Sequence, residues 1–577
     1  MSTATAVPTD AAPPPGEPGG RERGTERGAG WLLGAVIVAV VLVAGISAIG
    51  RGWLPVGDSA TIEMLVRDVG GPDTTLVGFN SRFTWNHPGP WTFWLLSIPY
   101  NLGGEDPTWM LLGAGVVNAA AAAGFAWVAF RKGGLALLAW AGFLYVVLVS
   151  AIGYETLRDP WNPWIAVLPF ALFVLAVWAV VDGDLPVMPV AFLAGSYALN
   201  NHSGYLGLSL TISAWMLAWV IGNAWWKRRT DRDGWSEYRR RLFVWLGISA
   251  AVVLVFWAPV LYEQLIAHSP GNITRMYDFF TTDDAPKATA GDALRIFGSE
   301  VGLQAPWLGW HEPADRFAEY LPRGAWTGLI TVAVFIATGL WAWRRRAWDA
   351  VRLHLTTAFV CLMGLVSLWQ LRGTQYRYLF RWTWVMGMFL VLASGWAIVR
   401  SLQEEPRRRV TRVGVPVLAA GTAVVAVLTM VLQWSQPLPL QVFEKQARDL
   451  IEPTVEAMKG DREKVFVTPA GFGLVVPYGA IVAALEAEGV DIRVPNKFFI
   501  AYGRHRALAE GEKATQVLTV AETDHEIDKL KADPNQRLIA EYIPSREEVR
   551  RDRIAHIAIF LSDQDVVGQP PPVPWGE

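Results

Sequence analysis

The sequence predicts a polytopic α-helical membrane protein that carries a C-terminal α/β domain. Of its 577 residues, 52% are hydrophobic and only 18% are charged, and the mean hydropathy is positive, which is rare in soluble proteins of this size. Thirty tryptophans are typical of a chain with many helix ends at the membrane–water boundary, where the amphipathic indole is favoured. The last part of the chain, from about Ser435 to Glu577, has a mixed polar and apolar pattern instead.

Eleven apolar runs are long enough to cross the bilayer, since a helix needs roughly 20 apolar residues to span about 30 Å of hydrocarbon. A further apolar segment, Trp91 to Tyr100, is too short to span comfortably and predicts an interfacial or partly inserted helix. The runs begin near residues 31, 108, 134, 163, 185, 204, 242, 324, 350, 376 and 413. The first 29 residues, rich in Pro, Gly, Ala, Thr and Arg, predict a disordered cytoplasmic tail.

The basic clusters predict the orientation of these spans. With the N-terminus inside, the span count puts four clusters in the cytoplasm, as the positive-inside rule requires. They are Arg131-Lys132, Lys227 to Arg241, Arg344 to Arg346, and Arg407 to Arg409. Counting Trp91 to Tyr100 as a span would put them outside. We therefore predict a multi-pass protein of the plasma membrane, with residues 30–434 as the transmembrane domain and residues 435–577 as an extracytoplasmic domain.

The C-terminal domain alternates two kinds of pattern. Short β-like runs at Lys464–Thr468 and Thr515–Val520 and a helical pattern at Tyr478–Glu488 predict a small α/β layer. Gly471-Phe472-Gly473 follows a predicted strand and is interpreted as a turn rather than a nucleotide site. The domain is assigned either to acceptor binding or to structural support.

Charge and cysteine content exclude some classes of function. The formal net charge is -2, and Lys and Arg come in short clusters rather than one basic stripe, so no nucleic-acid partner is expected. The single cysteine, Cys361, lies in an apolar run. An intramolecular disulfide, a cysteine-based metal site and a redox pair are therefore excluded, and Cys361 is predicted to pack in the core.

Two predicted outward loops contain acidic residues at the membrane face. Asp58 lies only a few residues beyond the first span, where it suits a general base acting on an alcohol or, equally, a cap for a helix beginning at Ser59. Asp159 precedes a proline between the third and fourth spans and predicts a turn. Either Glu155 or Asp159 can combine with Asp58 to bind a divalent cation such as Mg²⁺ or Mn²⁺, although a structural turn is the favoured interpretation.

Two further patterns place polar side chains beside apolar runs. The segment Asn200 to Tyr205 should face a polar cavity, with His202 favoured as a hydrogen-bonded structural histidine over a metal or proton ligand. Arg377 and Arg381 are four residues apart, so on a helix they share one face and can grip one phosphate. Lipid headgroups or acidic loop residues are the alternative partners of these arginines.

Four local strings carry a resemblance to a known family. They are Gly57-Asp58-Ser59-Ala60, Trp85-Asn86-His87-Pro88-Gly89-Pro90, Asp159-Pro160-Trp161-Asn162-Pro163 and Asn201-His202-Ser203-Gly204-Tyr205. Together with the acidic outward loops and the C-terminal domain, they resemble the GT-C superfamily of membrane glycosyltransferases over about residues 30 to 400. Within it, they look like actinobacterial, polyprenyl-phosphate-sugar dependent proteins related to the arabinofuranosyl- and mannosyltransferases of the cell wall.

The resemblance implies a hexosyl- or pentosyltransferase that moves arabinofuranose or a mannose-type sugar from a polyprenyl-phosphate carrier to a glycan or glycolipid acceptor, with inversion. Asp58 would be the general base. Asp159 would help bind metal or position the donor, and Arg377 and Arg381 would neutralise the leaving phosphate. His87 and His202 would be substrate-binding residues of the cavity, near the membrane lipids that hold the carrier.

The first loop departs from the family pattern. It lacks a tight Asp-x-Asp pair, because Asp58, Glu63 and Asp68 are five residues apart, which weighs against metal dependence. Glu63 and Asp68 are predicted to decorate an interfacial helix. A transporter or flippase of a lipid-linked envelope precursor is the alternative function, and a scaffold for envelope assembly is the third. A transporter would also need outward polar cavities and arginines for phosphate, but it predicts functional charges near the bilayer midplane and repeat symmetry between the halves, and the sequence clearly shows neither. A scaffold gives no account of Asp58, Asp159 and the arginine pair all lying on one side of the membrane.

Overall fold

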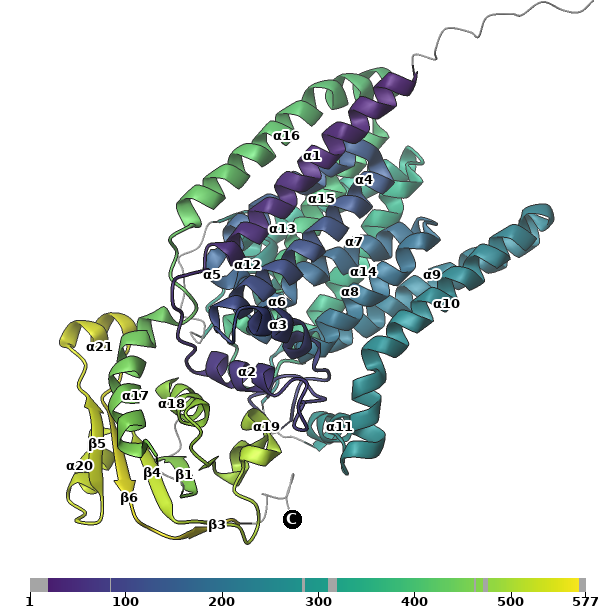
Figure 1. Cartoon of the computed structure of the whole chain (residues 1–577). Helices are drawn as coiled ribbons and strands as arrows, with labels where there is room; N and C mark the ends of the chain where they lie inside the picture. The colour runs from purple at the N-terminus through teal and green to yellow at the C-terminus, as the bar shows by residue number, and fades with distance from the viewer. Residues whose placement is uncertain are drawn as a thin grey trace, which may run out of the picture.

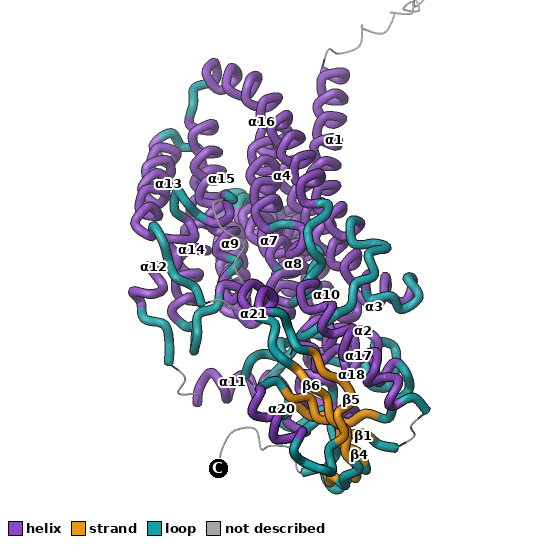
Figure 2. Tube along the Cα trace, turned by 90° about the vertical axis from the view of Figure 1, so that its left-hand side faces the viewer, coloured by secondary structure: helices purple, strands orange, loops and turns teal. Residues whose placement is uncertain are grey.

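A helix bundle joined at one end to a small sheet domain makes up the computed structural model of the chain (Figure 1). The structure describes residues 19–83, 85–282, 286–309, 319–460, 463–470 and 476–569. A view turned by 90° shows the sheet domain lying beyond the same end of the bundle (Figure 2). The protein is a multi-pass membrane protein, because nine helices among the described residues are long and apolar enough to cross a bilayer.

Every predicted apolar run falls on a helix of the bundle. The helix α4 (Thr108–Ile152) contains two of the runs and is broken at Gly133 and Gly134, where Gly134 has a φ of 58°. The run near residue 185 forms η1 (Leu185–Val187) and α8 (Met188–Asn201), which is shorter than a usual span. The other membrane helices are α1 (Gly19–Ile46), α7 (Val167–Val181), α9 (Leu206–Thr230), α10 (Arg232–Tyr262), α13 (Gly328–Arg344), α14 (Trp348–Trp369), α15 (Thr383–Ser401) and α16 (Glu404–Gln433).

The first helix begins earlier than predicted. Residues 19–29 of the predicted disordered tail belong to α1 and continue it toward the N-terminus. Residues 1–18 of the predicted tail lie outside the described residues. Extending an existing helix needs no new nucleus, and Arg, Glu and Ala have good helix propensity, so a charged segment can prolong a membrane helix.

The segment Trp91 to Tyr100 is a short helix, as predicted. It belongs to α3 (Trp91–Leu102), a 12-residue helix with Pro99 inside it. At 1.5 Å per residue this is about 18 Å, well short of the hydrocarbon thickness. Other short helices lie near it or link the spans: α2 (Asp58–Arg67), α5 (Tyr154–Leu157), α6 (Asn162–Ile165), α11 (Asn272–Thr282) and α12 (Ala290–Val301).

Basic residues at the end of the bundle away from the sheet domain are paired with acidic ones. Arg131 contacts Asp184 at 2.6 Å, and Lys132 contacts Asp182 at 2.6 Å. Asp182 also accepts from Arg352 at 2.7 Å, which brings α4, α7 and α14 together. In Figure 1 the N-terminal ends of α1 and α16 and the α9–α10 turn all point away from the sheet domain. The clusters therefore gather at one end, while the side of the membrane on which that end lies stays a prediction.

The C-terminal domain is the predicted small α/β layer. It begins after α16 ends at Gln433, and its five-stranded sheet has the order β2-β1-β4-β6-β5. Strand β1 pairs in parallel with β2 and β4, and β6 pairs antiparallel with β4 and β5. The strands are β1 (Val465–Pro469), β2 (Ile492–Arg493), β4 (Gln516–Ala521), β5 (Arg537–Tyr542) and β6 (Ile557–Ser562).

Helices cover this sheet and connect its strands. They are α17 (Glu444–Met458), α18 (Val476–Ala487), α19 (Phe499–Tyr502), α20 (Asp524–Lys531) and α21 (Arg546–Asp552), with a separate pair β3 (Lys513–Ala514) and β7 (Val566–Val567). The predicted strands lie on β1 and β4 and the predicted helix on α18. The predicted turn Gly471-Phe472-Gly473 lies outside the described residues. Cys361 is buried in α14, as predicted.

Candidate active site

A cavity of about 1400 Å³ lies between the helix bundle and the C-terminal domain. It is larger than the usual pocket for one drug-sized ligand, about 300–1,000 Å³, so it has room for two substrates. Residues of the C-terminal domain, including Val476, Gly479 and Tyr502, form part of its wall. Every residue that the sequence singled out for a site role lines this cavity: Asp58, His87, Asp159, His202, Arg377 and Arg381.

Asp58 is the first residue of α2. The preceding Gly57 has a φ of 55° and serves as the N-cap, and no side chain caps this helix. The interpretation of Asp58 as a cap is therefore wrong, because glycine turns the backbone instead and leaves the carboxylate to face the cavity. Its Oδ2 accepts a hydrogen bond from Nε1 of Trp161 at 2.8 Å. The helix N-terminus also favours a negative charge at this position.

Asp159 forms a hydrogen bond with Trp161, two residues further along the chain. Its side chain is buried, and Oδ1 accepts from the backbone N–H of Trp161 at 2.9 Å, which closes the predicted turn. Asp159 therefore fixes the backbone of the residue whose indole holds Asp58. The sequence reasoning missed Trp161, although an Asp followed two residues later by a hydrogen-bonding aromatic residue offered a signal.

His87 and His202 form a buried pair whose ring centroids are 4.7 Å apart. Nδ1 of His87 accepts from the N–H of Ser203 at 3.0 Å, and Nδ1 of His202 accepts from the N–H of Gly204 at 3.1 Å. A neutral imidazole with an accepting Nδ1 carries its proton on Nε2, so each ring can donate from Nε2 to a ligand oxygen.

Burial keeps both of these rings uncharged. Desolvation lowers the pKa of His202 to about 3, with a further contribution from the positive charge of Arg82. Desolvation also lowers the pKa of His87 well below its usual value, and the neighbouring His202 adds to this shift. The structure thus supports the hydrogen-bonding interpretation of His202, since Nδ1 is occupied and Nε2 is protonated.

Arg377 and Arg381 approach the cavity differently from the prediction. Arg377 begins a 3₁₀ turn, η6 (Arg377–Phe380), and α15 begins only at Thr383, so the expected α-helical face is wrong. A 3₁₀ turn has three residues per turn, so side chains at i and i+4 are not aligned. Both side chains nevertheless line the cavity, because η6 lies at the end of α15 that meets it.

Aromatic rings pack against the two guanidinium groups, and the buried Glu300 carboxyl lies near enough to Arg381 for the two charges to attract each other. The Cζ atom of Arg381 lies 4.1 Å from the ring centroid of Trp384 and 4.9 Å from that of Trp164, and Cζ of Arg377 lies 5.4 Å from that of Tyr320. Within the described parts of the chain neither arginine forms an ion pair, and both Nε atoms are buried without a hydrogen-bond partner. Cation–π contacts only partly replace lost hydration, so this pair suits an anionic ligand.

Glu300 of α12 supports the ring beneath Arg381. Its Oε2 accepts from Nε1 of Trp384 at 2.6 Å and from Oγ1 of Thr383 at 3.2 Å. The side chain is buried, and this burial raises the pKa of Glu300. Sequence reasoning missed Glu300, because nothing in its own segment indicates the tryptophan that it meets.

Asp58 and Asp159 alone do not make a complete metal site. Across the described ranges, no group of three or more His, Cys, Asp or Glu side chains is placed to hold a metal ion. A divalent cation at these two carboxylates would need phosphate oxygens and water as its remaining ligands. The cation stays a prediction, and no chemical step is assigned to it below.

Glu63 and Asp68 are not decorations of an interfacial helix. Glu63 is 7% exposed and accepts from Arg67 at 2.8 Å and from the hydroxyl of Tyr100 at 3.2 Å. Asp68 pairs with Arg506 of the C-terminal domain. The prediction fails because α2 lies between the bundle and the C-terminal domain rather than on the membrane surface.

Comparisons with known proteins find similarity in structure only. No family model and no curated protein matches the sequence. The crystal structure of ArnT from Cupriavidus metallidurans in the apo state matches with a TM-score of 0.52 and 14% identity, over 93% of this chain and 98% of that one. The structure of the same protein bound to undecaprenyl phosphate matches with a TM-score of 0.50 and 13% identity, over 92% of this chain and 98% of that one.

This likeness extends over nearly the whole of both chains, so it includes the bundle and the C-terminal domain together. At such low identity it bears on the fold and leaves the actinobacterial arabinofuranosyl- or mannosyltransferase subtype a prediction. The chain therefore has the fold of ArnT.

Proposed function

We propose that this protein is a membrane glycosyltransferase that moves a sugar from a polyprenyl-phosphate carrier to a cell-envelope acceptor. One observation carries the proposal: a single cavity holds the Asp58 carboxylate together with Arg377 and Arg381, which have no ion-pair partner within the described residues. The binding of undecaprenyl phosphate by ArnT, which shares the fold, supports a lipid-phosphate donor. The resemblance of the sequence favours arabinofuranose or a mannose-type sugar.

The proposed reaction is a single displacement at the anomeric carbon of the donor. Asp58 accepts the proton of the acceptor hydroxyl as its oxygen attacks that carbon. The bond between the anomeric carbon and the phosphate oxygen breaks, and the electron pair leaves with the polyprenyl phosphate. Attack opposite the leaving group inverts the anomeric centre. Trp161 orients Asp58 through the 2.8 Å hydrogen bond, and Asp159 orients Trp161.

Charge on the leaving phosphate grows during this step. A phosphodiester with one negative charge becomes a monoester that approaches two, so donors placed beforehand near its oxygens stabilise the transition state more than the ground state. Arg377 and Arg381 supply fixed positive charge. The Nε2–H groups of His87 and His202 supply neutral donors to sugar or phosphate oxygens.

The orientation of the protein is part of the proposal. The gathering of basic residues at the far end of the bundle supports a cytoplasmic location for that end, with the cavity and the C-terminal domain on the extracytoplasmic side of the plasma membrane. The acceptor, a glycan or glycolipid, would then meet the lipid-linked donor in the cavity.

The test compares transfer of labelled sugar from a panel of polyprenyl-phosphate donors to an envelope extract by purified wild type, Asp58→Asn and Asp106→Asn. Asparagine preserves shape, so Asp58→Asn should lose about 10²–10⁴-fold in rate through loss of the base alone. Asp106 lies just before α4, accepts a hydrogen bond from the N–H of Thr108 at 2.9 Å and does not line the cavity, so Asp106→Asn should keep its activity.

Thermal unfolding in detergent checks that both variants are folded, and the productive donor names the sugar. Equal transfer by wild type and Asp58→Asn would remove Asp58 from the mechanism. Absence of transfer from every donor would favour the transporter or flippase, which a vesicle assay of lipid-linked precursor movement would then test.

A further inference from the structure

The helix that begins with Asp58 contacts the C-terminal domain at its first turn. The N–H of Gly57 donates to the carbonyl of Val476 at 2.9 Å. A Cβ atom on Gly479 of α18 would lie 3.0 Å from the carbonyl oxygen of Gly57, so α18 passes directly against the start of α2. Met64 of α2 belongs to the hydrophobic core of the C-terminal domain. The packing of α2 is thus shared between the two parts of the molecule.

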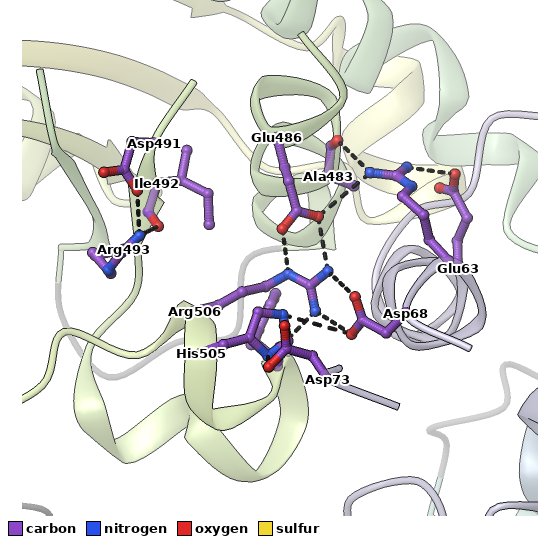
Figure 3. Close-up of polar contacts among 12 residues, drawn as sticks. Glu63, Asp68, Asp73, Ala483, Glu486, Asp491, Ile492, Arg493, His505 and Arg506 are labelled. Carbon is purple, nitrogen blue, oxygen red and sulfur yellow. Dashed lines mark hydrogen bonds and ion pairs between the residues drawn. The ribbon is translucent and has the colours of Figure 1, made fainter. Parts of the chain in front are cut away.

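The other end of α2 enters a set of ion pairs with the C-terminal domain, shown in Figure 3. Nη1 and Nη2 of Arg506 donate to the two carboxylate oxygens of Asp68 at 2.7 and 2.8 Å. Nε and Nη2 of the same arginine donate to the two oxygens of Glu486 at 2.6 and 2.9 Å. We call Glu63, Arg67, Asp68, Glu486 and Arg506 the interdomain ion network.

Arg67 extends this network along α2. It donates to Glu63 at 2.8 Å on its own helix and to Glu486 at 3.4 Å on α18. Glu486 therefore joins Arg67 of α2 to Arg506 of the C-terminal domain. The network links the last turn of α2 to α18 and to the segment after α19.

Arg506 is the central charge of the network. Its side chain is only 3% exposed, and the side chain of Asp68 is 10% exposed. His505 lies 3.7 Å from Asp68, but burial lowers the pKa of His505, and the nearby charge of Arg506 adds to the shift. The imidazole is therefore neutral near pH 7, and the guanidinium of Arg506 is what balances Asp68 and Glu486. Two bidentate contacts from one planar guanidinium group fix the distance and the orientation of Asp68 relative to Glu486.

We infer that Arg506 is a positioning residue for catalysis: by clamping the end of α2 to the C-terminal domain, it sets the place of Asp58 in the cavity. The inference rests on the proposed function for the role of Asp58. It also assigns the C-terminal domain a part in the transfer reaction beyond covering the cavity.

The clamp acts through a short, rigid helix. A helix of 10 residues is about 15 Å long, so a small tilt at its last turn moves Asp58 relative to a bound donor. A misplacement of about 1 Å at a reacting group costs about 100-fold in rate. The contacts of Gly57, Trp161 and Tyr100 remain when Arg506 is changed, so α2 should loosen rather than unfold.

The experiment compares Arg506→Gln with a matched control, Arg493→Gln. Arg493 also bridges two carboxylates, Asp491 and Glu512, but both belong to the C-terminal domain. Figure 3 shows Asp491 and Arg493 apart from the residues of the interdomain ion network. The first readout is hydrogen exchange of peptides from α2 in the full-length protein, measured by mass spectrometry. It does not depend on enzyme activity. The second readout is kcat and donor KM for sugar transfer.

We expect Arg506→Gln to speed exchange in α2 at least tenfold and to lower kcat by about 100-fold, with donor KM within about twofold of wild type. Arg506→Lys keeps the charge but not the bidentate geometry and should recover part of kcat. Arg493→Gln should leave exchange in α2 and kcat as in wild type.

Unchanged exchange in α2 for Arg506→Gln would overturn the clamp, whether or not any transfer is observed. Faster exchange with unchanged kcat would overturn its role in placing Asp58. Equal loss of kcat in Arg493→Gln would also overturn it, because the effect would then be general to the domain. If wild type transfers no sugar, the proposed function fails, and the exchange readout still decides whether the clamp exists.

Discussion

Replacing Arg381 by Gln removes one positive charge from the cavity while keeping a side chain of similar length. Two unit charges about 4 Å apart interact by about 4 kcal/mol at an effective dielectric constant of about 20. The leaving phosphate gains one charge, and if half of it has developed in the transition state, the loss is about 2 kcal/mol. This lies within the roughly 1.5–3 kcal/mol of a charge-assisted hydrogen bond. It corresponds to about a 30-fold fall in kcat.

The same substitution has an unusual expected effect on stability. Arg381 lies between Trp164 and Trp384 and has no ion pair among the residues that the structure describes. The loss of hydration around its buried charge outweighs the attraction of the nearby Glu300 carboxyl, so the variant breaks none of the described salt bridges and relieves a poorly hydrated cation. We expect Tm in detergent to equal or exceed that of wild type. Loss of activity without loss of stability is typical of a charge kept for a substrate.

Arg400→Gln on α15, the helix that begins just after Arg381, is the matched control. Arg400 pairs with Asp349 at 2.8 Å, and its side chain is 39% exposed, so the pair should contribute less than about 1 kcal/mol. The assay measures kcat and KM for labelled sugar transfer together with Tm for all three proteins. A variant Arg381→Gln with wild-type kcat/KM, or with a Tm that falls in step with activity, would refute the phosphate-binding role.

Three further predictions follow from the cavity. Trp161→Phe keeps the ring and loses the hydrogen bond to Asp58, so kcat should fall about tenfold with unchanged donor KM, and an unchanged kcat would exclude this orienting role. The pKa of His202 is lowered to about 3 in the folded protein but is near 6.5 in the unfolded chain, so below pH 6.5 the unfolded state binds a proton that the folded state does not. The free energy of unfolding should therefore be highest above pH 6.5 and should fall between pH 6.5 and 3 by up to about 1.4 kcal/mol per pH unit. His202→Gln should flatten this dependence of Tm on pH, and an identical slope would contradict it. If the predicted cation lies between Asp58, Asp159 and the donor phosphate, EDTA should abolish transfer and Mg²⁺ or Mn²⁺ should restore it, and transfer that continues in EDTA would exclude that cation.

The positions of the membrane helices were predictable because the signal for a membrane span is local, whereas the eleven predicted runs fall on nine helices that are long and apolar enough to span in the described residues. Length and hydropathy decide whether a segment such as Trp91 to Tyr100 can cross about 30 Å, and no tertiary contact is needed for that decision. The strands at Lys464–Thr468 and Thr515–Val520 carry a similar local pattern. The break in α4 at Gly134 follows equally from its own residues.

The candidate site was predictable only as a set of residues. Costly polar groups beside apolar runs identified Asp58, Asp159, His202 and the arginine pair, since such groups need a cavity. The backbone conformation and the hydrogen-bond partners of each of these residues were not predictable. The helical face expected for Arg377 and Arg381 is a 3₁₀ turn, and the expected cap Asp58 is a hydrogen-bonded carboxylate whose capping role passes to Gly57.

By itself, the sequence determined that this chain crosses a membrane many times, ends in an α/β domain and gathers its unusual polar residues in loops, because hydropathy and periodicity are properties of neighbouring residues. Only the tertiary structure decided that Trp161 holds Asp58 across 103 residues, that Glu300 holds Trp384 across 84, and that Arg506 holds Asp68 across 438. Each of these contacts joins two segments, and the sequence pattern of neither segment indicates that the other will be its partner. Their pairing is set by how the helices and the sheet pack, which no local signal encodes.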